Sequence, residues 1–175
     1  MVVVHSQAAK QKRQRPVTVR LVDSAAASDS STPSSADIIN SATISVPVQT
    51  IIDFAQQFDP QPYHLDPEAG AESIFGGLCA SGWQVAAFAT RLLGEALLQA
   101  DIPFVEITSV EQMRWKRPTF VDDSIRVELQ VLERRRDNPI PECDTLRINA
   151  RVLNQADAEV AHLMTSVAIE QGPAS

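Results

Sequence analysis

The sequence predicts an α+β domain in which a curved antiparallel sheet wraps around one central buried helix. The stretch from Gly82 to Ala100 is apolar nearly all round, as expected of a helix enclosed by other structure. Four segments with alternating apolar and polar residues follow it, at Phe104–Trp115, Ser124–Arg134, Thr145–Leu153 and Val160–Ile169. With 175 residues, 44% hydrophobic and 21% charged, the chain has the composition of one globular domain.

The chain divides into a tail, residues 1–41, and a domain, residues 42–175. The segment Ser24–Ser35 consists almost entirely of serine, alanine, threonine and proline, so it has little to bury and resembles a flexible linker. The domain is expected to begin with a short strand from Ala42 to Val48, which Pro47 restricts to the edge of a sheet or to a strand end.

Two helical segments are expected before the buried helix. Apolar residues recur at helical spacing from Val48 to Phe58, and Pro60 predicts that this helix stops near Phe58. Asp66 followed by Pro67 predicts a capped single turn over residues 66–71, with the aspartate as the N-cap. Between the two lie Asp59 and His64, in a segment whose two prolines favour turn and extended conformations.

Charge and composition exclude several classes of protein. Residues 42–175 carry ten basic and nineteen acidic residues, and so acidic a domain argues against nucleic acid as the partner. No apolar run is long enough for a membrane span, and the basic residues follow the apolar N-terminus, which reverses the order of a secretory signal. The two cysteines have no spacing typical of a metal site, so we expect reduced thiols in a cytoplasmic protein that needs no metal.

Asp59 and His64 are the candidate acid/base pair. A carboxylate and an imidazole that face one pocket can exchange protons with water near neutral pH, which suits the addition of water to an activated carbonyl compound or its removal. From these residues alone, Asp59 is as well explained as an Asx-turn residue closing a helix, and His64 as a structural histidine.

A resemblance favours catalysis. The run FDPQPYHLD at residues 58–66, the pair Gly76-Gly77, and Ala80-Ser81-Gly82-Trp83 opening the buried helix resemble the MaoC-like (R)-specific enoyl-CoA hydratases and dehydratases of the hotdog fold. The resemblance implies a homodimer, or a higher homo-oligomer, that hydrates a 2-enoyl thioester or dehydrates a 3-hydroxyacyl thioester, carried by coenzyme A or an acyl carrier protein. It implies that Asp59 and His64 hold one water, that the Gly82 N–H binds the thioester carbonyl, and that no cofactor is used.

Five further residues are candidate substrate contacts. Ser81 stands where many relatives place a histidine, and it is either the helix N-cap or a ligand of the thioester. Trp83 is large, which favours a short or branched acyl group. Arg114, Lys116 and Arg117 are the cations best placed for coenzyme A phosphates, although a solvated sheet edge explains them equally well. Arg134–Arg136 form a second basic patch, for which we favour a surface loop.

Three other readings stay open. A hotdog thioesterase would need a carboxylate from the buried helix, where Glu95 is the only acid well inside. A non-catalytic module for acyl-thioester binding or dimerisation would turn Asp59 or His64 away, or fill the pocket with Trp83 and Phe88. Cys79 lies in an apolar run, so we favour a core residue over a nucleophile.

Overall fold

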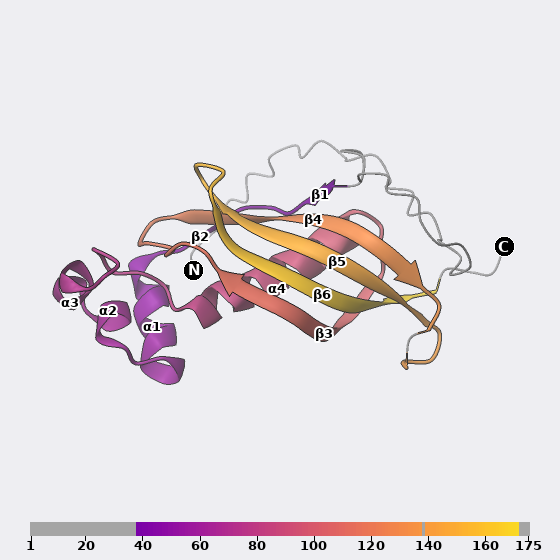
Figure 1. Ribbon diagram of the computed structural model, residues 1–175, viewed down its shortest axis with the longest axis horizontal. Coiled ribbons are helices and arrows are strands. Elements are labelled where there is room, and N and C mark those ends of the chain that lie inside the picture. The colour runs from indigo at the N-terminus through magenta and orange to yellow at the C-terminus, as the bar shows by residue number, and fades with distance from the viewer. Residues whose placement is uncertain (1–37, 138, 172–175) are drawn as a thin grey trace, which may run out of the picture.

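All the strands of the domain belong to one antiparallel sheet (Figure 1). The structure is a computed structural model that describes residues 38–137 and 139–171. The sheet has the order β1-β4-β5-β6-β3, and β2 also pairs with β4. The strands are β1 (Ile38–Asn40), β2 (Ile44–Ser45), β3 (Phe104–Trp115), β4 (Ser124–Arg135), β5 (Cys143–Asn154) and β6 (Glu159–Glu170). Among the described strands β3 pairs only with β6, so it forms one edge of the sheet.

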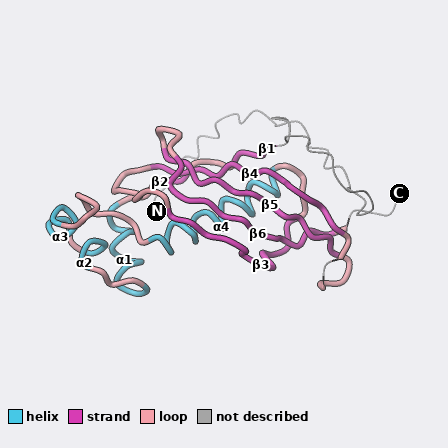
Figure 2. The backbone as a smooth tube through the Cα atoms, in the orientation of Figure 1, coloured by secondary structure: helices cyan, strands magenta, loops and turns pink. Residues whose placement is uncertain are grey.

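The helix α4 (Gly82–Gln99) runs along the inner face of this sheet, as Figure 2 shows. Leu93 and Leu97 are at most 1% exposed, and they belong to the same core as Ile148 of β5. The predicted sheet curved around a buried helix is therefore confirmed. The prediction that α4 is buried on all sides is wrong, since its residues Trp83 and Leu98 are 63% and 56% exposed. No helix within the described residues is long and apolar enough to cross a membrane.

Three short helices gather at one end of the sheet, beside the start of α4 (Figure 1). They are α1 (Val48–Phe58), α2 (Pro62–Leu65) and α3 (Pro67–Glu72). The predicted bounds of α1 and the Asp66 cap of α3 are confirmed, since the Asp66 carboxylate accepts hydrogen bonds from the N–H groups of Glu68 and Ala69. The turn or extended segment expected before Asp66 is wrong in part, because Pro62 occupies the first position of a one-turn helix.

The start of the sheet corrects the predicted tail. β1 pairs with β4 through Ile39, which faces Leu129 and is 1% exposed, so the sheet begins by Ile38 rather than at Ala42. Three residues beside a polar tract are too few for a periodicity to show, which is why sequence reasoning assigned them to the tail. The rest of the predicted tail, residues 1–37, lies outside the described residues.

Candidate active site

Asp59 and His64 face each other across a narrow gap. Asp59 is the residue that caps the C-terminus of α1, and His64 lies in the single turn of α2. The carboxylate oxygen Oδ2 of Asp59 is 3.6 Å from Nε2 of His64, and the two side chains are 23% and 8% exposed. A water oxygen that lies to one side of the pair can be at ordinary hydrogen-bond distance from both atoms. The pair thus has the geometry needed to hold and deprotonate a water.

A backbone carbonyl sets the protonation of the histidine ring. Nδ1 of His64 lies 2.7 Å from the Cys79 carbonyl oxygen, which can only accept a hydrogen bond. Nδ1 therefore carries the proton in the neutral ring, and Nε2, which lies 3.6 Å from the Asp59 carboxylate, keeps the lone pair. Sequence reasoning had no signal for this contact, which joins α2 to residues 15 positions further along the chain.

Ser81 holds the other member of the pair. Its hydroxyl donates to Oδ2 of Asp59 at 2.7 Å and accepts a hydrogen bond from the Trp83 N–H at 3.2 Å. The predicted N-cap role is thus confirmed, because Ser81 caps α4. Ser81 is fully buried and does not line the cavity described below. Its hydroxyl is therefore placed to orient Asp59, and a contact between Ser81 and the thioester stays a prediction.

We expect Ser81→Ala to lower kcat/KM about 10- to 100-fold, because a hydrogen bond to a charged group contributes about 1.5–3 kcal/mol. The substitution also removes the cap of α4. Ser81→Gly is the matched control, since glycine is a good N-cap that lacks the hydroxyl. Steady-state kinetics and thermal melting of both variants separate the two effects. Full activity in Ser81→Gly would contradict the role of Ser81 in orienting Asp59.

A cavity of about 370 Å³ opens beside the pair. Asp59, His64 and Gly82 all line it, so the three predicted catalytic residues come together. Gly82 is the first residue of α4, where a backbone N–H has no acceptor within the helix. The N-terminus of a helix also carries partial positive charge, so this N–H is suited to an oxygen that gains negative charge.

Aromatic side chains form much of the wall, and sequence reasoning missed most of them. Both tryptophans, the single tyrosine and Phe75 line the cavity. Trp83 and Trp115 meet edge to face with ring centroids 5.0 Å apart. Thr119 also lines the cavity, is 1% exposed, and its hydroxyl has no hydrogen-bond partner among the described residues.

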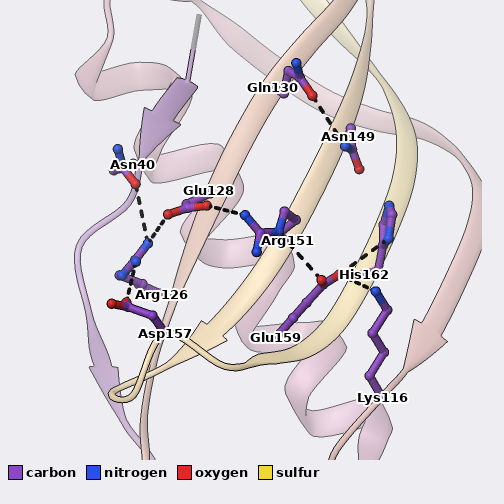
Figure 3. A network of polar contacts seen from close by, with 10 residues as sticks. All are labelled: Asn40, Lys116, Arg126, Glu128, Gln130, Asn149, Arg151, Asp157, Glu159 and His162. Carbon is purple, nitrogen blue, oxygen red and sulfur yellow. Dashed lines mark hydrogen bonds and ion pairs between the residues drawn. The ribbon is translucent and has the colours of Figure 1, made fainter. Parts of the chain in front are cut away.

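Two of the three predicted phosphate-binding cations lie at the cavity. Lys116 and Arg117 line it, and both are held by Glu159 at the start of β6. The Lys116 ammonium donates to the Glu159 carboxylate at 2.8 Å, and Arg117 donates to the Glu159 carbonyl oxygen at 2.7 Å. Figure 3 shows Glu159 joined also to Arg151 and His162 on the outer face of the sheet. Burial alone would raise the pKa of Glu159, but the Lys116 hydrogen bond and nearby positive charges lower it overall.

The other predicted cations lie elsewhere. Arg114 pairs in register with His162 on the sheet and does not line the cavity. The candidate patch Arg134–Arg136 lies at the end of β4 and beyond it, and none of its members lines the cavity. Arg134 instead forms a 2.7 Å ion pair with Asp144, whose side chain is 3% exposed. These arginines therefore lie away from the cavity, in the sheet and on the surface of the protein.

The residues on which the alternative functions depend are not placed or activated as those functions require. Glu95 forms a surface ion pair with Arg91 and does not line the cavity, so it is not placed as a thioesterase carboxylate would be. Phe88 packs against the core, so it does not fill the pocket as a non-catalytic module would require. Cys79 lines the cavity, but burial raises the pKa of its thiol, which disfavours the nucleophilic thiolate.

Residues 38–137 and 139–171 contain no cluster of three histidine, cysteine, aspartate or glutamate side chains able to hold a metal ion.

Known structures share this architecture. The crystal structure of a MaoC-like dehydratase from Rhodospirillum rubrum aligns with a TM-score of 0.67 at 35% identity, covering 79% of this chain and 93% of that one. The R-hydratase PhaJ1 from Pseudomonas aeruginosa aligns with a TM-score of 0.57 at 24% identity, covering 77% of this chain and 81% of that one, and at this identity it shows the fold alone. The fold is the hotdog fold, as the sequence resemblance implied.

Sequence comparison identifies the family. The family model described as MaoC like domain matches residues 5–149. The uncharacterized protein YdeM of Bacillus subtilis (strain 168) is 27% identical over 134 residues, which cover 77% of this chain and 93% of its own length. The chain belongs to the MaoC-like dehydratase family, and a hydro-lyase activity in general follows from this membership.

Proposed function

We propose that the protein adds water to the double bond of a 2-enoyl thioester, or removes it from the 3-hydroxyacyl thioester in the reverse direction. One observation carries the proposal. Oδ2 of Asp59 and Nε2 of His64 lie 3.6 Å apart beside a cavity that Gly82, the first residue of α4, also lines. Hydration of an enoyl thioester needs both features, a held water and a donor for the carbonyl oxygen.

The proposed mechanism divides the reaction between these two features. The water oxygen bonds to C3 of the substrate while one of its protons passes to the Asp59 and His64 pair. The electrons of the double bond move toward C2 and the thioester carbonyl, whose oxygen gains negative charge opposite the Gly82 N–H. The pair then delivers one proton to C2 and returns to its starting protonation state. The Ser81 hydroxyl and the Cys79 carbonyl keep the pair aligned.

The carrier is proposed to be coenzyme A or an acyl carrier protein. Lys116 and Arg117, which line the cavity, are the cations that would meet the phosphate shared by both carriers. Trp83 also lines the cavity, and its large side chain supports our expectation of a short or branched acyl group. No metal or organic cofactor enters this mechanism, and a cytoplasmic location stays our prediction.

We also propose that the protein is a homodimer joined along β3. This edge strand is twelve residues long and mostly exposed, so a row of backbone hydrogen-bonding groups is left for a second copy. Val105 and Val110 on β3, with Leu98 on α4, are 42%, 53% and 56% exposed and give the contact an apolar component. Light scattering would give about twice the 19.1 kDa of one chain, and a monomer at micromolar concentration would contradict the proposal.

The test of the proposed function is a hydration assay. The ultraviolet absorbance of the conjugated thioester should disappear when the protein is mixed with 2-enoyl-CoA substrates. Linear and branched acyl chains of increasing length would be compared, and we expect the short and branched ones to have the highest kcat/KM. A folded dimer that binds these thioesters without hydrating any of them would favour the binding module over the enzyme.

A further inference from the structure

Trp115 and Gly82, which both line the cavity, are joined by a hydrogen bond. Trp115 is the last residue of β3, and its indole Nε1 donates to the Gly82 carbonyl oxygen at 2.7 Å. This bond joins the edge strand of the sheet to the first residue of α4 across 33 positions of sequence. Neither the mechanism above nor the sequence resemblance assigns a role to Trp115.

The indole also explains why residue 82 is a glycine. A Cβ atom added to Gly82 would lie 2.6 Å from Nε1 and 2.8 Å from Cε2 of Trp115, closer than real side chains approach. Gly82 does not have a positive φ, so its backbone conformation is open to any residue. The requirement for glycine therefore comes from the space that Trp115 occupies and not from backbone conformation.

The first turn of α4 is thus held from two sides. On one side the Ser81 hydroxyl bonds to Asp59 and to the Trp83 N–H, and on the other the Trp115 ring bonds to the Gly82 carbonyl. Trp83 packs edge to face on the same ring, at an interplanar angle of 76°. Helix ends fray when nothing holds them, and a catalytic donor misplaced by about 1 Å lowers the rate by about 100-fold.

We propose that Trp115 is a positioning residue, which fixes the first turn of α4 so that the Gly82 N–H meets the thioester oxygen in the transition state. The inference rests on the proposed function, since it assigns the Gly82 N–H to that oxygen. Trp115 then affects kcat, through the position of Gly82, rather than substrate affinity alone. A residue that served only as a wall of the cavity would change KM and leave kcat unaltered.

Four variants test this inference, with kcat and KM measured on the best 2-enoyl-CoA substrate. Trp115→Phe keeps an aromatic ring beside Gly82 and removes the N–H donor, so we expect kcat to fall about tenfold with KM changed by less than about twofold. Gly82→Ala should lower kcat about 100-fold in the wild-type background. Trp115→Ala removes the ring that an added Cβ would meet. In that background Gly82→Ala should therefore lower kcat less than about fivefold, compared with Trp115→Ala alone.

Two results would overturn the inference. One is an equal loss of kcat on Gly82→Ala in the wild-type and Trp115→Ala backgrounds, because the two residues would then act independently. The other is a Trp115→Phe variant in which only KM changes. If the wild-type protein hydrates no enoyl thioester, the proposed function fails instead. Thermal melting then still tests the contact between residue 82 and the Trp115 ring. Gly82→Ala should lower Tm in the wild-type background and should lower it much less in the Trp115→Ala background.

Discussion

Asp59→Asn and His64→Ala should each lower kcat for enoyl-thioester hydration by about 10²- to 10⁴-fold. Asparagine has nearly the shape of aspartate and can still accept from Ser81, but its amide cannot take up a proton from water. His64→Ala removes the Nε2 lone pair that lies 3.6 Å from Asp59. In the proposed mechanism both residues act on the same water, so the double variant should be little worse than either single one.

The measurement combines turnover with binding. Both tryptophans line the cavity, so intrinsic fluorescence reports ligand binding at this site in every variant. We expect the dissociation constant for a 2-enoyl-CoA to change less than about threefold while kcat falls by orders of magnitude. Additive losses in the double variant, or residual turnover within about tenfold of wild type, would contradict a shared water as the basis of catalysis.

Most of the fold could be predicted from periodicity. The alternation of apolar residues placed β4 within one residue of its observed bounds, and helical spacing with Pro60 placed α1. Both signals are local, since each depends on which face of an element meets the core. β1 and α2 gave no such signal because each is four residues or shorter, and only contacts with distant segments hold them in place.

The site was predictable only in part, for a related physical reason. Asp59, His64 and Gly82 stand in a contiguous stretch that resembles a known family, so their neighbourhood could be inferred from sequence. The groups that orient them lie further away in the chain, such as the Cys79 carbonyl and the Trp115 indole. Nothing in the residue type of a cysteine indicates that its carbonyl fixes a histidine tautomer. Arg114 was misjudged because proximity to Lys116 in sequence does not place both side chains at one cavity.

Gly70→Ala should destabilise the protein and disturb the site together. Gly70 is buried in α3, where an added Cβ would lie 2.6 Å from the Leu78 nitrogen and 2.8 Å from the Gly77 carbonyl carbon. Those are backbone atoms, so no side chain can rotate away, and the loop itself must move. Overpacking of this kind costs about 1–3 kcal/mol, or about 2–4 °C in Tm for each kcal/mol. The displaced loop leads directly into Cys79, whose carbonyl holds His64.

Gly77→Ala is the matched control from the same loop. Its added Cβ would approach only the Phe120 ring, at 3.3 Å, and that side chain can yield by a few tenths of an ångström. We therefore expect Gly77→Ala to keep Tm within about 2 °C of wild type, whereas Gly70→Ala loses both stability and at least about tenfold in kcat. Equal melting temperatures for the two variants would show that α3 can shift without moving the loop. Lower stability with unchanged kcat would show that the His64 contact tolerates the shift, because the Cys79 carbonyl would have moved without consequence for turnover.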